Sequence, residues 1–287
     1  MAETKKKTNK NGGRKSSSAR HSASERKASP RKKAKEWPRW VQVLIAAAIT
    51  SVLLFFSYHL FLKQIIFRFA VCDGIKAYQT CIPRGYEIMG IDISHHQGNI
   101  DWQELQDGLS PDAPIRFVYM KATEGYNYKD KRFNSNWKRA KEHGFVRGAY
   151  HYFTEKSSGD AQAAMFIKNV ELESGDLPPM IDIEEEPKDK DAFLIEVKKF
   201  ILRLEEHYGV KPIIYSYAKY HNKYLDETFF NDYVFWVAHY YVDNPDVERD
   251  WRIWQFTDIG RIPGISKKTD INVLSGGEEA LQELLIK

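Results

Sequence analysis

From residue 86 onward, apolar runs of strand length alternate with segments of helical periodicity, and this alternation limits the fold more than any other feature. Five strand–helix pairs follow one another, and three strand-like runs with short connections come after them. Because parallel strands need a long crossover, usually a helix, this pattern is typical of a parallel sheet. It predicts an α/β fold, an incomplete TIM-type barrel of five β/α units followed by three strands.

The expected elements are placed by residue number. Strands are expected at 86–93, 115–122, 146–153, 179–184, 211–217, 233–239, 251–256 and 269–273. Helices are expected to open at 102 and to cover 134–143, 159–170, 192–207 and 278–286. The helix over 192–207 is amphipathic, with Phe193, Val197, Ile201 and Leu204 on one side.

Residues 180–185 (MIDIEE) place two carboxylates in an otherwise apolar strand. Side chains alternate across a strand, so Asp182 and Glu184 lie on the same side, roughly 6–7 Å apart along the chain. Such carboxylates are costly unless they are paired, hydrogen-bonded or kept partly neutral. A pair of this kind favours acid catalysis of glycosidic bond cleavage. The alternative is a strand end that runs into a solvated acidic loop, since Glu185 and Glu186 follow directly.

Polar and aromatic residues recur at the carboxyl ends of the other expected strands, where parallel barrels form their active sites. Each one alone is explained as a barrel-lining or loop residue, but their recurrence at the same end favours a shared site. Rings in these positions suit a carbohydrate cleft, because the C–H faces of sugars stack on them. The residues are Asp92, Ser94, Lys121, Glu124, Tyr150, His151, Tyr152, Phe153, Tyr215, Tyr217, Trp236, Trp254, Gln255 and Asp270.

The N-terminal part of the chain differs sharply in charge from the rest. Residues 1–39 hold fourteen of the 43 basic residues and three of the 39 acidic ones, a net charge of +11, against −7 for the remainder. This tail is nearly free of large apolar residues, so we expect it to be disordered. A nucleic-acid-binding arm is the less favoured alternative, because no aromatic residue interrupts the tail before Trp37.

Residues 41–62 contain no charged side chain, and 22 helical residues span roughly 33 Å, enough to cross a bilayer. A cleaved signal sequence and a buried core helix are the alternatives. The stretch is too long for a signal core, and we expect a transmembrane helix over 40–62. The positive-inside rule then places the tail in the cytoplasm and the later residues outside, in the periplasm or the extracellular space.

Residues 63–85 are expected to form a juxtamembrane linker that carries the two cysteines of the chain, Cys72 and Cys81. Outside the cytoplasm these form either a local disulfide or two unpaired thiols. Neither cysteine has metal-site spacing to another ligand, so no metal and no cofactor are expected. The catalytic domain is expected to cover 86–287.

Several blocks of residues follow one another along the chain in a recognisable order and spacing. They are Gly90–Gly98 with Asp101-Trp102, Lys121–Gly125, Gly148–Phe153, Asp182–Glu184, Tyr215-Ser216, Trp236–Ala238, Trp254–Phe256 and Asp270–Asn272. Together these blocks resemble glycoside hydrolase family 25, the lysozymes of the N-acetylmuramidase type, and the resemblance covers about residues 86–285. The resemblance implies a (β/α)5(β)3 barrel that cleaves the β-1,4 bond from N-acetylmuramic acid to N-acetylglucosamine in peptidoglycan.

The same resemblance implies roles for particular residues. Glu184 is expected to be the general acid, and Asp182 to position the substrate's 2-acetamido group or to stabilise the charged intermediate. Asp92 and Asp270 are expected to be accessory acids. The candidate substrate contacts are Tyr152, Tyr215, Trp236, Trp254 and Gln255.

The function expected from these observations is that of a membrane-anchored muramidase in cell-wall remodelling or turnover. Its partners are peptidoglycan glycan strands and, through residues 40–62, the lipid bilayer; no nucleic acid and no protein partner are expected. One alternative is a catalytically silent peptidoglycan-binding protein, because a fold alone does not establish activity. Another is a hydrolase of a different N-acetylated glycan such as chitin.

Overall fold

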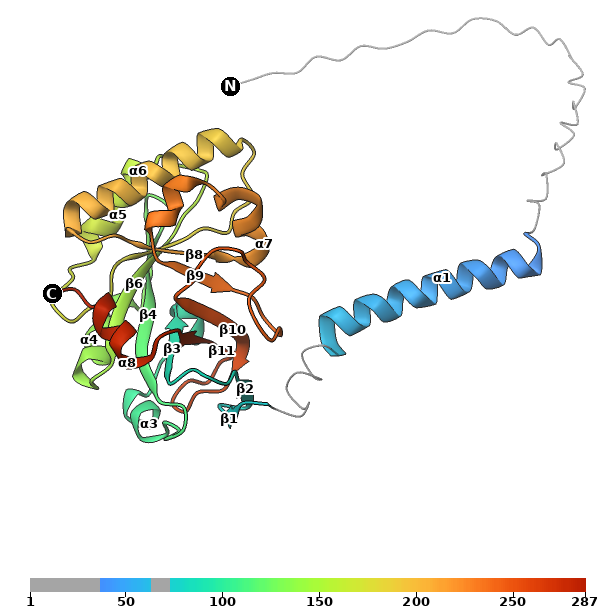
Figure 1. Cartoon of the computed structure of the whole chain (residues 1–287), viewed down its shortest axis with the longest axis horizontal. Helices are drawn as coiled ribbons and strands as arrows, with labels where there is room; N and C mark the ends of the chain where they lie inside the picture. The colour runs from blue at the N-terminus through green and yellow to red at the C-terminus, as the bar shows by residue number, and fades with distance from the viewer. Residues whose placement is uncertain (1–36, 63–72) are drawn as a thin grey trace, which may run out of the picture. The chain divides into compact units, whose positions relative to one another are not determined.

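The computed structural model describes residues 37–62 and 73–287, which form an N-terminal helix and a barrel (Figure 1). Apart from its last three residues, the tail predicted over 1–39 lies outside the described residues. The first ten positions of the predicted linker, Cys72 among them, lie outside them as well.

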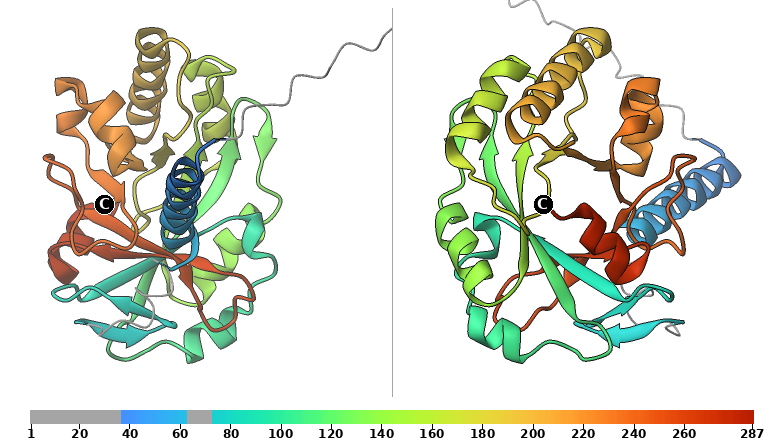
Figure 2. Two further views of the ribbon diagram at one scale, coloured as in Figure 1. Left: turned by 90° about the vertical axis from the view of Figure 1, so that its right-hand side faces the viewer. Right: turned by 60° about the vertical axis from the view of Figure 1, so that its left-hand side comes forward.

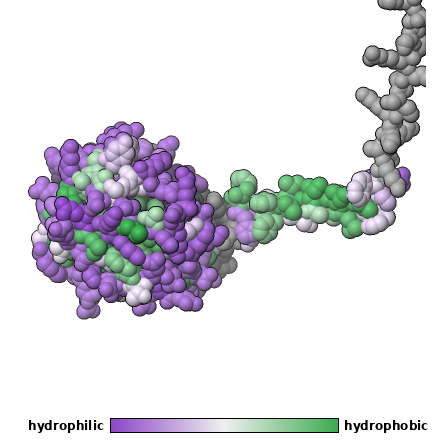
Figure 3. Space-filling model, turned by 90° about the horizontal axis from the view of Figure 1, so that it is seen from above, coloured by the Kyte–Doolittle hydropathy of each residue, from purple (hydrophilic) through white to green (hydrophobic). Residues whose placement is uncertain are grey.

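The N-terminal helix α1 (Arg39–Ser57) continues as a π-helix, η1 (Tyr58–Leu62). No side chain of the two segments is buried, and the space-filling view shows their apolar surface in green (Figure 3). Together they span 24 residues and form one helix that is long and apolar enough to cross a membrane, the single such helix among the described residues. The uncharged stretch predicted over 41–62 lies within it.

Eight strands of the barrel close into a ring. They are β3 (Ile88–Ile93), β4 (Ile115–Glu124), β6 (Val146–Tyr152), β7 (Met180–Asp182), β8 (Ile213–Tyr217), β9 (Phe235–Ala238), β10 (Ile253–Gly260) and β11 (Thr269–Leu274). Their order in the sheet is β3-β11-β10-β9-β8-β7-β6-β4, and the ring closes because β3 also pairs with β4. Neighbouring strands are parallel along the series β3, β4, β6, β7, β8, β9 and β10. Strand β11 lies between β10 and β3 and is antiparallel to both. The short strand β5 (Tyr128–Lys129) extends the sheet as a hairpin on β4.

Helices connect the parallel strands in turn. They are α3 (Trp102–Asp107), α4 (Phe133–Glu142), α5 (Gly159–Asn169), α6 (Lys190–Tyr208), and the short α7 (Ala218–Tyr220) with η3 (His221–Leu225) and η4 (Thr228–Asp232). The 3-10 turn η2 (His95–Gln97) follows β3, and α8 (Gly277–Leu284) follows β11. Local sequence explains the bounds of α6: Asp189 caps its first turn by accepting from the Ala192 N–H, and Gly209 ends it with φ +68°.

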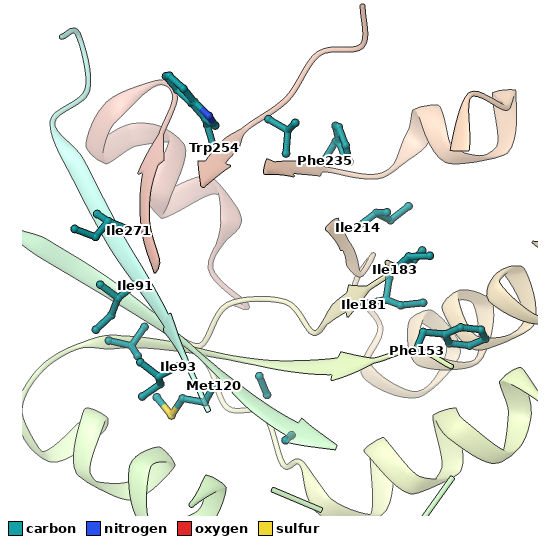
Figure 4. Close-up of a cluster of buried hydrophobic side chains, with 14 of the residues drawn as sticks. Ile91, Ile93, Met120, Phe153, Ile181, Ile183, Ile214, Phe235, Trp254 and Ile271 are labelled. Carbon is teal, nitrogen blue, oxygen red and sulfur yellow. The ribbon is translucent and has the colours of Figure 1, made fainter. Parts of the chain in front are cut away.

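Two apolar layers follow from the alternation of side chains along the ring strands. Inward-facing residues such as Phe117, Trp236 and Ile253 pack together inside the barrel. Outward-facing residues such as Ile181 and Trp254 belong to a larger cluster shared with the helices (Figure 4). Burial of the wall on both sides is what parallel strands require.

The sequence did not predict a hairpin of β1 (Ile75–Ala77) and β2 (Thr80–Ile82), which lies within the expected linker and appears in teal in Figure 2. Its turn residue Tyr78 is buried, and the Tyr78 hydroxyl donates to the Ala113 carbonyl at 2.8 Å. The backbone carbonyl of Tyr78 accepts from the Arg261 N–H at 2.9 Å. Cys81 in β2 is disulfide-bonded. Residues 75–82 therefore pack as part of the barrel body, although three-residue strands leave too little periodicity to be predicted.

Candidate active site

A pocket of about 330 Å³ lies at the carboxyl ends of the parallel strands, where the sequence predicted the site. Its walls are rich in acids and tyrosines. They are formed by Asp92, Ser94, His96, Lys121, Tyr150, Tyr152, Met180, Asp182, Glu184, Tyr215, Tyr217, Tyr240, Gln255, Asp258 and Asp270.

Strand register explains why these residues meet. Asp182 is paired with Tyr152 on one side and with Tyr215 on the other, so these three residues of neighbouring strands lie at one height in the barrel. Asp92 is paired with Asp270. Because β11 runs antiparallel to β3, a residue near its start lies beside a residue near the end of β3. Two carboxylates thus come from each side of the pocket.

Strand β7 ends at Asp182, yet its alternation continues for two more residues. The Ile183 N–H donates to the Tyr215 carbonyl at 3.0 Å, and the Ile183 side chain is fully buried in the outer layer. Glu184 therefore faces inward again, as Asp182 does. Asp182 is 8% exposed, and its Oδ1 atom is buried without a hydrogen-bond partner. An unpaired buried acceptor is costly, so this atom is an open place for a donor.

The environment of this pair favours protonated carboxyls. Burial raises the pKa of Asp182 well above its ordinary value, and the nearby charge of Glu184 raises it further, whereas Lys121 opposes the shift. Burial also raises the pKa of Glu184, and the hydroxyl of Tyr217 partly offsets this. Two neighbouring carboxyl groups do not both ionise easily, because their negative charges repel. The pair therefore keeps one proton at pH values where an ordinary carboxylic acid has lost it.

Asp92 lies in a different environment from Asp182. Its Oδ2 atom accepts from Gln255 Nε2 at 2.8 Å and from Asn272 Nδ2 at 2.9 Å. Burial raises the pKa of Asp92, and these two hydrogen bonds oppose the rise. Burial, and then the charge of Asp92, raise the pKa of Asp270 well above its ordinary value.

One lysine lines the acidic pocket. Lys121 Nζ lies 2.7 Å from Glu124 Oε2 and 4.6 Å from the centre of the Tyr152 ring. Its side chain is 11% exposed, so its charge acts on the pocket with little screening. Across residues 37–62 and 73–287, His, Cys, Asp and Glu side chains form no cluster of three or more that could hold a metal ion.

Comparison with known proteins assigns the family. The model of the glycosyl hydrolases family 25 matches residues 91–265. The chain belongs to this family. A relative, the YegX protein of Escherichia coli, is 40% identical over 210 residues, which cover 72% of this chain and 77% of YegX.

Other members of family 25 agree with this assignment. Lysozyme M1 of Streptomyces globisporus is 34% identical over 215 residues, 69% of this chain and 71% of that protein. A family 25 glycosyl hydrolase from Bacillus anthracis has a similar structure, with a TM-score of 0.66 at 33% identity, covering 71% of this chain and 96% of that one. The family 25 chain described here is therefore a glycoside hydrolase of the lysozyme type.

Seven of the nine site residues predicted from the sequence of this family 25 chain line the pocket. The two exceptions are Trp236 and Trp254, both with 0% exposure, so neither indole has a free face for a sugar. Trp254 points to the outer layer because it adjoins Gln255, which points inward. Trp236 points inward but is packed against Tyr119 and Tyr215 inside the barrel.

His151, noted at a strand end, also lies away from the pocket. Its ring is fully buried between hydrogen bonds to Thr123 at 2.7 Å and Gln162 at 3.1 Å, and it stacks on Phe200. Burial lowers the pKa of His151 to about 3, so it is a neutral structural residue.

Four pocket residues were not among the sequence candidates: His96, Met180, Tyr240 and Asp258. Tyr240 lies two positions past the end of β9, and the alternation that found Glu184 would have found it. Asp258 lies three positions after Gln255, which strict alternation places on the opposite face. A register shift between Gln255 and Thr257 brings it inward, and no sequence signal marks that shift.

Proposed function

We propose that this family 25 enzyme is a membrane-anchored muramidase, which hydrolyses the β-1,4 bond between N-acetylmuramic acid and N-acetylglucosamine in peptidoglycan. The observation that carries the proposal is the convergence of Asp182 and Glu184 in one pocket, with the pKa of each raised by burial. The similarity to Lysozyme M1 supports the choice of substrate.

Glu184 is the proposed general acid. Its raised pKa keeps a proton available above the ordinary range of a glutamic acid, and its side chain is only partly buried, so a substrate can reach it. As the bond between the anomeric carbon and the leaving oxygen breaks, the Glu184 proton passes to that oxygen. A water molecule then adds to the anomeric carbon, and the Glu184 carboxylate takes the proton that this water loses.

Asp182 is the proposed partner of the substrate's 2-acetamido group. Its unpaired Oδ1 is a buried acceptor, and the acetamido N–H is a donor of the right kind. A hydrogen bond between them would orient the acetamido oxygen toward the anomeric carbon and stabilise the positive charge that develops during cleavage. Substrate-assisted hydrolysis of this kind is a known variant of the two-carboxylate mechanism.

The remaining pocket residues are proposed to shape the site. Asp92 and Asp270 act as accessory acids, and the negative charge of Asp92 favours the protonated form of Glu184. Tyr152, Tyr215 and Gln255 are proposed to contact the sugar, because all three line the pocket.

For the whole chain we propose a cytoplasmic tail over 1–39, a transmembrane helix over 40–62, a juxtamembrane segment over 63–85 whose hairpin at 75–82 packs on the barrel, and a catalytic domain over 86–287. The order of five strand–helix units and three final strands supports classification of the barrel as (β/α)5(β)3. The catalytic domain would act outside the cytoplasmic membrane, in cell-wall remodelling or turnover. A reporter fused after Lys287 should therefore be active only outside the cytoplasm, and activity inside would overturn this topology.

The substrate is tested by product analysis. The full chain, solubilised in detergent, is incubated with purified peptidoglycan and separately with chitin, and the new reducing ends are identified. New muramic acid ends support the proposal. Glucosamine ends or soluble chitin products would instead identify another glycosidase, and glycan binding without any cleavage would identify a binding protein.

A further inference from the structure

Asp92 is the pocket carboxylate whose surroundings are most completely built from protein donors. Two side-chain amides, Gln255 Nε2 and Asn272 Nδ2, donate to the same oxygen, Oδ2. Both amide residues are buried, with exposures of 2% and 0%, and they are cross-strand partners in β10 and β11. An oxygen that accepts two buried N–H groups is favoured in its ionised form.

The orientation of the Asn272 amide is fixed by chemistry. The indole Nε1 of Trp236 lies 3.0 Å from Asn272 Oδ1, and an indole nitrogen is a donor only, so its partner must be the amide oxygen. The amide nitrogen of Asn272 therefore faces the other way, toward Asp92 Oδ2 and the Gly90 carbonyl. A fully buried tryptophan thus determines which group Asp92 meets.

Gln255 is held in the same manner by different donors. The hydroxyls of Tyr215 and Tyr240 both donate to Gln255 Oε1, the first at 2.8 Å. This directs Gln255 Nε2 to Asp92. Two independent chains of hydrogen bonds therefore end on one carboxylate oxygen.

We infer that Trp236 and Asn272 are positioning residues for hydrolysis, which act through Asp92 by holding it as the fixed anion of the pocket. Neither residue lines the pocket, so neither contacts substrate. The anion they hold raises the pKa of Glu184, which follows β7, and the pKa of its own cross-strand partner Asp270, and so favours the protonated form of both. The inference rests on the proposed muramidase activity and extends it to residues beneath the pocket.

The hydrogen bonds to Asp92 should affect how activity depends on pH. Hydrogen bonds to the ionised carboxylate lower the pKa of Asp92, so removing a donor raises it. If activity requires ionised Asp92, the acid limb of the profile of kcat/KM against pH then moves to higher pH. For Asn272→Leu, which removes one amide donor directly, we expect a shift of about one pH unit, and for Trp236→Phe about half a unit.

Trp254→Phe is the matched control. Trp254 is also fully buried, and its indole Nε1 also donates one hydrogen bond, to the His239 carbonyl at 2.9 Å. It differs from Trp236 in facing the outer layer, away from Asp92. The same chemical change at this position should therefore leave the acid limb in place, even if it lowers the midpoint of thermal unfolding.

The experiment measures pH profiles of peptidoglycan hydrolysis for the full chain and the three variants, with thermal unfolding of each. An upward shift of the acid limb in Asn272→Leu and Trp236→Phe, but not in Trp254→Phe, supports the inference. A limb that stays in place in folded Asn272→Leu, or that moves equally in the control, overturns it.

If the wild-type chain has no muramidase activity, the proposed function is contradicted. The inference is then tested by a second measurement, which does not require activity. The Asp92 carboxyl carbon is then titrated by NMR, its signal assigned by its loss in Asp92→Asn. A raised pKa of Asp92 in Asn272→Leu supports the inference, and an unchanged pKa overturns it.

Discussion

The two sides of the pocket both carry carboxylates, but the hydrogen-bond partners of these carboxylates differ. On the β3 and β11 side, the Oδ2 atom of Asp92 is occupied by two amide donors. On the β7 side, the Oδ1 atom of Asp182 has no partner. Buried acceptors are normally satisfied, so this contrast separates a side that the protein completes from a side that it leaves for a ligand. Under the proposed mechanism, the hydrogen-bond partners of a pocket acid decide whether it is a fixed charge, as Asp92 is, or a group that meets the substrate, as Asp182 is.

The largest effect is expected at the reactive side. Glu184→Gln removes the proposed proton donor while keeping the size of the side chain, and general acid catalysis typically contributes 10²–10⁴-fold in rate. We expect kcat to fall by roughly 10³-fold or more, with glycan binding retained. Rates of reducing-end release and a binding isotherm for a peptidoglycan fragment measure the two effects. Near-normal turnover would refute the role of Glu184.

Asp182→Asn is expected to be the next most damaging change. It removes the negative charge that the developing positive charge requires, and we expect a loss of about 10²-fold in kcat, as for other single electrostatic contacts. A substrate without the 2-acetamido group is already slow, so the variant should lower its hydrolysis much less. Equal losses on both substrates would show that Asp182 does not act through that group.

Stability provides a smaller effect, which should differ between the two acids of the β3 and β11 side, Asp270 and Asp92. The folded-state pKa of Asp270 lies above its unfolded value, so stability is fully present at low pH and is lost as pH rises through the folded pKa. Asp270→Asn removes this loss and should stabilise the chain by on the order of 1 kcal/mol at pH 8, roughly 2–4 °C in Tm. The gain should vanish near pH 4.

Asp92→Asn is the comparison for that measurement. Its amide oxygen can still accept the two N–H donors, but a neutral acceptor binds them less strongly. The variant no longer buries a charge, which stabilises the fold, but its hydrogen bonds are weaker, which destabilises it. Because the two effects oppose each other, we expect a smaller change in Tm than for Asp270→Asn. Similar gains for both variants, measured by calorimetry at pH 8, would contradict the stabilisation of ionised Asp92 by its two amide donors.

The smallest effect is expected for Tyr217→Phe. The hydroxyl of Tyr217 lowers the pKa of Glu184, so its removal raises that pKa. The alkaline limb of activity, where Glu184 loses its proton, should move upward by a few tenths of a pH unit, with kcat changed only a few-fold. A downward shift in the pH profile would show that Tyr217 stabilises the protonated acid instead.

The sequence predicted the order of strands and helices and the inward direction of Asp182 and Glu184, because periodicity and alternation are local properties. It did not predict which inward residues reach the pocket. Trp236 pairs with Tyr215 across β8 and β9, yet only Tyr215 lines the pocket, since barrel interiors are filled in layers drawn from alternate strands. Trp254 does not line the pocket, because it and its neighbour Gln255 face opposite sides of the strand.

Other features depend on contacts between distant residues. The inward position of Asp258 follows from an irregularity in the pairing of β10 with β11. The orientation of the Asn272 amide depends on Trp236, 36 residues away in the chain. Neither feature can be predicted from the residues nearby in the sequence. The sequence therefore predicts most residues of the site but not the hydrogen bonds between them.

The most direct test is a crystal structure of Glu184→Gln with a bound peptidoglycan fragment. We predict that the acetamido N–H of the muramic acid lies within hydrogen-bond distance of Asp182 Oδ1, while Gln255 and Asn272 still donate to Asp92. A fragment whose acetamido group points away from Asp182, or displaces the amide donors from Asp92, would contradict the division of the pocket into an occupied side and an open one.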